Sequence, residues 1–136
     1  MRGQDVGANA GAMQLLEDLF RAFNDHDAEK VVSLMTEDCV FEAAAGPEVF
    51  GARHTGRPAV RAAFEAVWRG LPDVQWVVTG HFVSGDRAVS EWIFRATRPD
   101  GARIEVQGCD LFTLRDGLVA SKKAFRKDRP VVAPKV

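Results

Sequence analysis

The chain has 136 residues, of which 46% are hydrophobic and 27% are charged, and its formal net charge is −1. This length suits one domain, and the composition is that of a globular protein with enough apolar residues for a core. The near-neutral charge excludes binding to nucleic acid or to an anionic membrane by charge alone, and no apolar run approaches the ~18 residues that a membrane span needs.

The two ends of the chain are expected to carry little structure. Residues 1–11 are rich in glycine and alanine, lack hydrophobic periodicity and contain only Arg2 as a basic residue. They predict a disordered leader and not a signal peptide, so a cytoplasmic location is the default expectation. Residues 129–136 contain two prolines and predict a C-terminal tail, which leaves one domain over residues 12–128.

Apolar residues at helical spacing predict three helices in the first half of the chain. The first covers residues 12–24, and Asp27 can cap a second helix that runs to about Met35. Pro58 fits the first turn of the third helix, where a missing N–H is not needed, and Gly70 can end that helix.

Strand patterns occupy the rest of the chain. Residues 39–44 predict a short strand, and residues 46–56 predict a loop with three glycines. After Pro72, period-two alternation predicts four strands whose connections each contain a glycine turn signal, which is typical of an antiparallel meander. These strands are expected over residues 74–83, 88–97, 102–114 and 118–126. The order predicts an α+β fold in which three N-terminal helices pack on a curved, mostly antiparallel sheet around an internal pocket.

Asp110 is the strongest candidate for chemistry. It lies in the third strand of the predicted meander, on a face whose other residues are apolar or glycine. An ionised and unpaired carboxylate on an apolar face is strongly unfavourable, so Asp110 must find a partner, stay protonated or face a pocket. Gly108 removes a side chain beside it and would leave room for a ligand. A buried aspartate that is bound to the backbone or to an arginine is the structural alternative.

Glu91 is a second candidate acid. It interrupts the apolar alternation between Val89 and Ile93. The other face of the same strand is at least as apolar, so Glu91 could face the pocket or the solvent. If Glu91 and Asp110 line one cavity, their repulsion raises the pKa of one of them and produces an acid/base pair.

Two basic residues, Lys122 and Arg126, alternate with alanines on the last predicted strand. If that face is concave, they are counter-ions for the two carboxylates. If it is convex, they are solvated, and Val119 and Phe125 point inward instead. The pattern leaves both arrangements open.

Aromatic residues and one histidine complete the predicted pocket. His54 lies in the glycine-rich loop and could line the pocket mouth. The aromatic residues are core residues first, and some of them are expected to form the apolar wall of a cavity. The candidates for this wall are Phe23, Phe41, Trp68, Trp92 and Phe112.

Several sequence motifs are absent. The chain has no P-loop, GxGxxG, GxSxG or HExxH motif, and its two cysteines lack zinc spacing. We therefore expect neither a metal nor a cofactor. Tyrosine is missing altogether, which excludes any mechanism that needs a phenol.

Four segments carry a family resemblance. They are DAEKV at 27–31, TEDCVF at 36–41, GRPAV at 56–60 and LFTLRDGLV at 111–119. The chain resembles the SnoaL-like branch of the NTF2-like superfamily over about residues 12–128, and ketosteroid isomerases and polyketide cyclases are relatives. The resemblance implies a cone-shaped α+β fold, usually a homodimer, with the active site inside the cone.

The resemblance also implies roles for some positions. Asp110 matches the protonated aspartic acid that helps to form the oxyanion site of ketosteroid isomerases. Ala43 stands where those isomerases have a base aspartate, with Glu42 beside it, and their oxyanion tyrosine has no counterpart. The acid that many cyclases place on the last strand is missing, since this chain reads KAFRK at 123–127.

These features favour a cofactor-independent isomerase or cyclase-like enzyme that acts on a small apolar molecule, such as a carbonyl compound. Asp110 or Glu91 would be the general acid or base, and Lys122 or Arg126 would stabilise negative charge. A binding protein without turnover is one alternative. Another is a dimeric scaffold whose cavity is closed by its own salt-bridge network.

Overall fold

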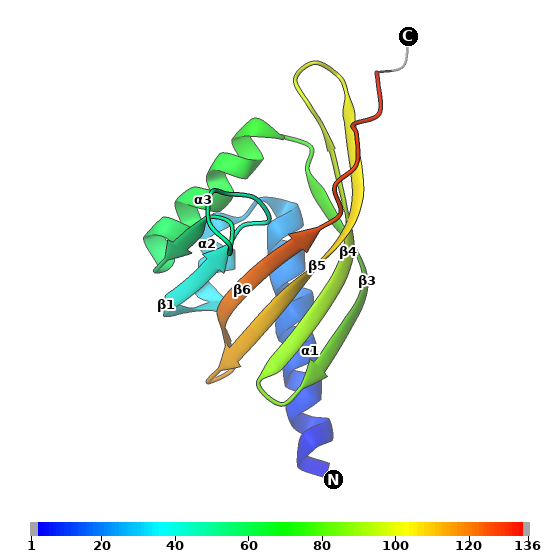
Figure 1. Ribbon diagram of the computed structural model, residues 1–136. Coiled ribbons are helices and arrows are strands. Elements are labelled where there is room, and N and C mark those ends of the chain that lie inside the picture. Colours follow the sequence, from blue (N-terminus) through cyan, green and yellow to red (C-terminus); the bar gives the residue numbers. More distant parts are fainter. Residues whose placement is uncertain (1–2, 135–136) are drawn as a thin grey trace.

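The computed structural model describes residues 3–134, with side chains from residue 9 onward. Three helices and six strands are formed within these residues (Figure 1). They are α1 (Gly3–Asp25), α2 (Ala28–Ser33), β1 (Met35–Glu42), β2 (Arg53–Thr55), α3 (Arg57–Gly70), β3 (Gln75–Ser84), β4 (Arg87–Thr97), β5 (Arg103–Arg115) and β6 (Leu118–Arg126). None of the described helices is both long enough and apolar enough to cross a membrane.

The six strands form one sheet in the order β2-β1-β6-β5-β4-β3. The last four strands form the predicted meander, and every pair is antiparallel except β1 with β6. The sheet curves, and its concave face is covered by α1 and α3 (Figure 1). The predicted α+β fold with a mostly antiparallel sheet is thus confirmed.

The helix α1 begins at Gly3, so residues 3–11 continue a helix where a disordered leader was expected. This segment has no apolar stripe of its own. A helix that is already anchored can extend because each added residue gains a backbone hydrogen bond without a new nucleation step. Met1, Arg2, Lys135 and Val136 lie outside the described residues.

Two other boundaries differ from the prediction. Met35 starts β1 where the second helix was expected to end, and the glycine-rich loop contains β2, which pairs with β1. A three-residue strand is too short to show alternation. At the other end, Val132 pairs with Arg103 through two backbone hydrogen bonds of 2.8 Å, so part of the predicted tail follows β5.

The core joins the helices to the concave face. The α1 stripe is buried, and Phe23 stacks on Phe64 of α3 at 4.8 Å between ring centroids. Phe64 stacks in turn on Phe41 of β1 at 4.7 Å. At the end of α1, the Asn24 amide bonds both the N–H and the C=O of Trp76, at 2.8 and 3.0 Å. These contacts hold α1 and α3 at a fixed distance from the sheet.

Candidate functional site

An internal pocket of about 360 Å³ lies on the concave side of the sheet. This volume falls within the range of small-molecule sites. Its wall comes from α3, from the segment after β1 and from β3, β4 and β6. The lining residues are Phe41, Ala43, Ala44, Ala45, Phe64, Ala66, Val67, Gly70, Leu71, Trp76, Trp92, Phe94, Lys122, Ala124 and Arg126. The pocket that the sequence predicted is therefore present.

A buried ion pair lies behind this wall. Asp110 is 0% exposed and Lys122 is 3% exposed, and Lys122 Nζ lies 2.9 Å from Asp110 Oδ1. This ion pair is the contact that compensates Oδ1, which has no other partner among the described side chains. The Trp92 indole Nε1 donates to Oδ2 at 3.0 Å. Burial raises the pKa of Asp110 above its ordinary value, and Lys122 and Trp92 oppose that shift.

Three phenylalanine rings surround the Lys122 ammonium. Its Nζ lies 4.6 Å from the centroid of Phe41 and 5.4 Å from the centroids of Phe23 and Phe64. Such ring faces attract a cation, most strongly where water is excluded. Lys122 also lines the pocket, whereas Asp110 does not. Of the two residues of the ion pair, only Lys122 therefore lines the pocket.

Gly108 provides space for a side chain of the protein itself and not for a ligand. A Cβ at this position would lie 2.5 Å from the Trp92 ring and 2.5 Å from the Phe125 carbonyl oxygen. Trp92 faces Gly108 across the β4–β5 pair, so the indole fills the predicted gap. This packing lets Trp92 reach Asp110 and separates the carboxylate from the pocket.

Arg126 lies at the end of β6, on the same face as Lys122. Much of the residue is exposed, but its guanidinium carbon lies 4.5 Å from the centroid of Phe94, and the residue lines this pocket as well as a groove on the convex face. Partial burial lowers the pKa of Arg126 from its ordinary value. No carboxylate among the described side chains lies within ion-pair distance of it. The face of β6 that carries Lys122 and Arg126, whose orientation the sequence pattern left open, is therefore concave. Asp110 pairs with Lys122 and not with Arg126.

Glu91 lies on the opposite face of the sheet from Asp110. It is exposed and pairs with Cys109, while Ser90 occupies the concave position opposite Asp110. The two acids therefore do not share a cavity, and the predicted acid/base pair is not formed. Glu91 instead borders a groove of about 450 Å³ on the convex face. Trp92 and Phe94 decide which face of β4 is buried, because burial of two large aromatic rings stabilises the fold more than burial of the smaller side chains next to them.

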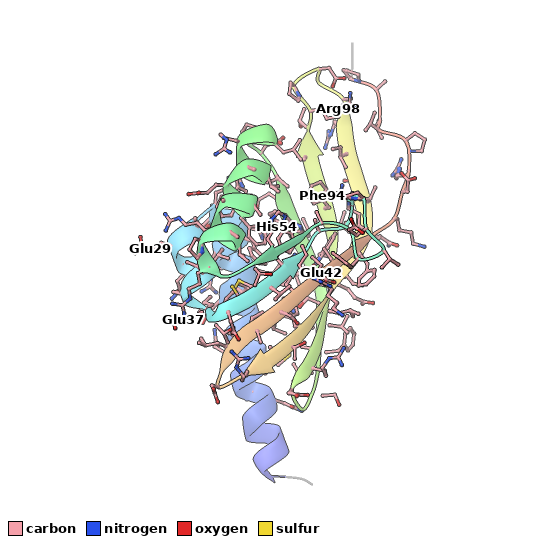
Figure 2. All side chains as sticks on the ribbon, turned by 60° about the vertical axis from the view of Figure 1, so that its left-hand side comes forward. Glu29, Glu37, Glu42, His54, Phe94 and Arg98 are labelled. Carbon is pink, nitrogen blue, oxygen red and sulfur yellow. The ribbon has the colours of Figure 1, made fainter. Side chains whose placement is uncertain are left out.

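Of the five aromatic candidates, Phe41 and Trp92 line the pocket. Phe23, Trp68 and Phe112 are buried in the core outside it. His54 lies in β2 (Figure 2) and stacks on Phe41 at 5.7 Å between ring centroids, so it contacts a wall residue without lining the pocket.

Sequence analysis missed several wall residues. Ala43, Ala44 and Ala45 follow β1 and leave space because their side chains are small. Phe94 lies two residues after Trp92 in β4 and so shares its face. Both patterns were visible in the sequence.

Glu42, the acid beside Ala43, is buried but occupied elsewhere. Its Oε2 lies 2.7 Å from Nη2 of Arg53 and accepts a hydrogen bond of 2.8 Å from Nε of the same residue. Glu42 does not line the pocket. A base at this position of the fold is therefore absent from the pocket wall.

Comparison with known proteins agrees with the fold. The SnoaL-like domain matches residues 16–122. No curated protein matches the chain. A putative polyketide cyclase from Xanthomonas campestris has 19% identity and a TM-score of 0.75, over 85% of this chain and 90% of that one.

Two further solved structures share the fold. TerC, co-crystallised with polyporic acid, has 19% identity and a TM-score of 0.74, over 86% of this chain and 92% of that one. An NTF2-like protein of unknown function from Mesorhizobium loti has 28% identity and a TM-score of 0.72, over 88% and 93%. With the domain match over residues 16–122, the chain belongs to the SnoaL-like domain family.

Proposed function

We propose that the protein is a cofactor-independent enzyme of the isomerase or cyclase type that acts on a small, largely apolar carbonyl compound in the internal pocket. The observation that carries this proposal is the position of Lys122. Lys122 lines a wall that is aromatic and aliphatic apart from Arg126, and the fully buried Asp110 backs its ammonium. A cation in an apolar site stabilises a developing oxyanion far more than it does in water.

The proposed chemistry begins with a hydrogen bond from Lys122 to the substrate carbonyl oxygen. This bond polarises the carbonyl and makes the protons on the adjacent carbon more acidic. When a solvent water molecule or buffer base takes up such a proton, the electron pair of the broken C–H bond moves onto the oxygen as an enolate, and the ammonium stabilises the new charge. Asp110 is a positioning residue in this scheme, because it holds Lys122 at 2.9 Å without lining the pocket.

Proton exchange on a ketone tests the proposal. The probe is 2-tetralone in D₂O, with NMR measuring the replacement of its α-protons by deuterium. The wild-type protein is expected to accelerate exchange, and the double variant Lys122→Met/Asp110→Asn, which removes both charges of the pair, is expected to lose roughly 10²–10³-fold of that rate. The variant Lys123→Met removes an exposed lysine from the convex side of the same strand and is expected to exchange like the wild type.

Exchange by the wild type at the rate of buffer alone would contradict the enzymatic proposal. The single variant Asp110→Asn adds a separate readout. Because Lys122 would lose its counter-ion, the pH profile of exchange is expected to shift, and a purely structural role of Asp110 would leave that profile unchanged.

Binding without turnover is the second candidate function. One observation favours it: the pocket-lining residues include neither a carboxylate nor a histidine, so this wall offers no evident general base. TerC, which shares the fold, was co-crystallised with a small molecule. A ligand that binds in the pocket and is recovered unchanged, together with no exchange on 2-tetralone, would favour this function.

We also propose a homodimer that forms through the convex face of the sheet. Val77, Phe82 and Phe125 are 42%, 58% and 52% exposed, and Phe125 borders the convex groove. Exposed apolar surface of this kind is typical of an interface. Light scattering is expected to give the mass of two chains for the wild type and of one chain for Phe125→Arg. A wild-type monomer at high concentration would contradict the proposal.

A further inference from the structure

The pocket wall carries an excess of positive charge. Its two charged side chains are both cations, Lys122 and Arg126. Asp110 neutralises Lys122, since the two groups lie 2.9 Å apart and are both buried. Arg126 has no such partner among the described side chains. A ligand in this pocket therefore meets one uncompensated positive charge.

The surroundings of Arg126 leave it free to bind an anion. Phe94 covers one face of the guanidinium at 4.5 Å. Stacking of this kind fixes the plane of the group and leaves its N–H edges available. A carboxylate matches those edges with two parallel hydrogen bonds. Arg126 is partly buried beside Phe94, which lowers its pKa, and a bound anion would replace the solvation that this burial removes.

The remaining wall sets the shape of the ligand. Trp76, Trp92 and Phe94 present aromatic surface, and the alanines at 43–45 leave space opposite them. Flat apolar molecules fit such walls because they bury a large area without losing much conformational freedom.

We propose that the pocket selects a flat, largely apolar carboxylate, with the carboxylate on Arg126 and the body against Trp92 and Phe94. This inference rests on the proposed function, because it names the ligand class of the same pocket. It makes Arg126 the residue that determines specificity, whereas Lys122 remains the group that meets a carbonyl.

An NMR titration with two matched probes tests the inference. They are 2-naphthoate and its neutral isostere 2-naphthamide. The wild type is expected to bind naphthoate roughly tenfold or more tightly, which is the difference that one charge-assisted pair supports. The indole signals of Trp76 and Trp92 are expected to shift, while Trp68, which does not line the pocket, serves as an internal reference.

Two variants test which positive charge causes the preference for naphthoate. Arg126→Gln is expected to remove the preference for naphthoate while keeping the affinity for naphthamide. Lys123→Gln makes the same change in net charge on the convex side and is expected to keep the preference. A fold check by amide NMR spectra accompanies both variants.

Each adverse result has a distinct meaning. Equal affinity of the wild type for the two probes would overturn the carboxylate inference and leave the pocket function standing. An equal loss of preference in Arg126→Gln and Lys123→Gln would also overturn it, because the effect would then be long-range charge. If neither probe binds, the inference and the proposed small-molecule function fail together.

Discussion

The two faces of the sheet carry hollows of similar size but of different character. The concave pocket measures about 360 Å³ and the convex groove about 450 Å³. Behind the concave wall lies an ion pair that is almost fully buried, whereas the convex groove is bordered by exposed residues such as Glu91 and Phe125. Volume alone would favour the convex groove. Desolvated charge beside an apolar wall is what identifies the concave pocket as the candidate site.

The largest expected effect comes from removing one partner of the buried ion pair on the concave side. Lys122→Met leaves Asp110 as a buried, uncompensated carboxylate and is expected to lower the free energy of unfolding by about 3–5 kcal/mol. Urea denaturation measures this loss. Adding Asp110→Asn is expected to restore part of it, because neither position of the pair then carries a charge.

The matched change on the convex side is Glu91→Gln, which alters an exposed carboxylate and is expected to change stability by less than about 0.5 kcal/mol. Equal losses in Lys122→Met and Glu91→Gln would contradict the contrast between the two faces.

A medium effect concerns the packing that separates Asp110 from the pocket. Gly108→Ala places a methyl group 2.5 Å from both Trp92 and the backbone of Phe125. Because backbone cannot yield easily, this overpacking is expected to lower stability by about 1–3 kcal/mol. Thermal unfolding checks the value.

Gly11→Ala is the matched control, because a Cβ there has no neighbour within 4 Å. In a helix this change is expected to raise stability by about 0.5–1 kcal/mol. A Gly108→Ala variant as stable as the wild type would show that Trp92 does not need this space.

The smallest expected effect is a pH dependence from His81. Burial lowers the pKa of His81, and Nδ1 lies 2.7 Å from the hydroxyl oxygen of the buried Ser90. The unfolded chain therefore takes up a proton at a higher pH than the folded chain. The contribution is fully present above the unfolded pKa of about 6.5 and is lost as the pH falls from there toward the folded pKa.

Melting temperatures of the wild type and of His81→Gln between about pH 5 and pH 7.5 check this effect. The wild type is expected to lose more stability than the variant as the pH falls. Parallel curves would show that His81 makes no such contribution.

The sequence predicted the strands well because each meander strand alternates clearly and each connection contains a glycine turn. It also predicted that Asp110 lies on an apolar face and must find a partner, stay protonated or face a pocket. It left the partner of Asp110 open, because an irregularity in the β5–β6 pairing between Thr113 and Leu114 decides which side chains of β6 face the core. That irregularity places both Val119 and Lys122 on the buried side, which strict alternation would not allow.

Two other features, the orientation of Glu91 and the contact at Gly108, depend on side-chain size and not on the pattern of polar and apolar residues. Both faces of β4 are apolar, so the pattern alone could not place Glu91 on the convex face. Gly108 marked a space correctly, but only the cross-strand register shows that Trp92 fills it. A search for large aromatic residues opposite a strand glycine would have found this contact.

The most direct test of the account is a crystal structure of the protein with 2-tetralone. The account predicts the ligand in the concave pocket, with its carbonyl oxygen within hydrogen-bond distance of Lys122 Nζ and its rings against Trp92 and Phe94. Binding in the convex groove, or a carbonyl oxygen that points away from Lys122, would contradict it.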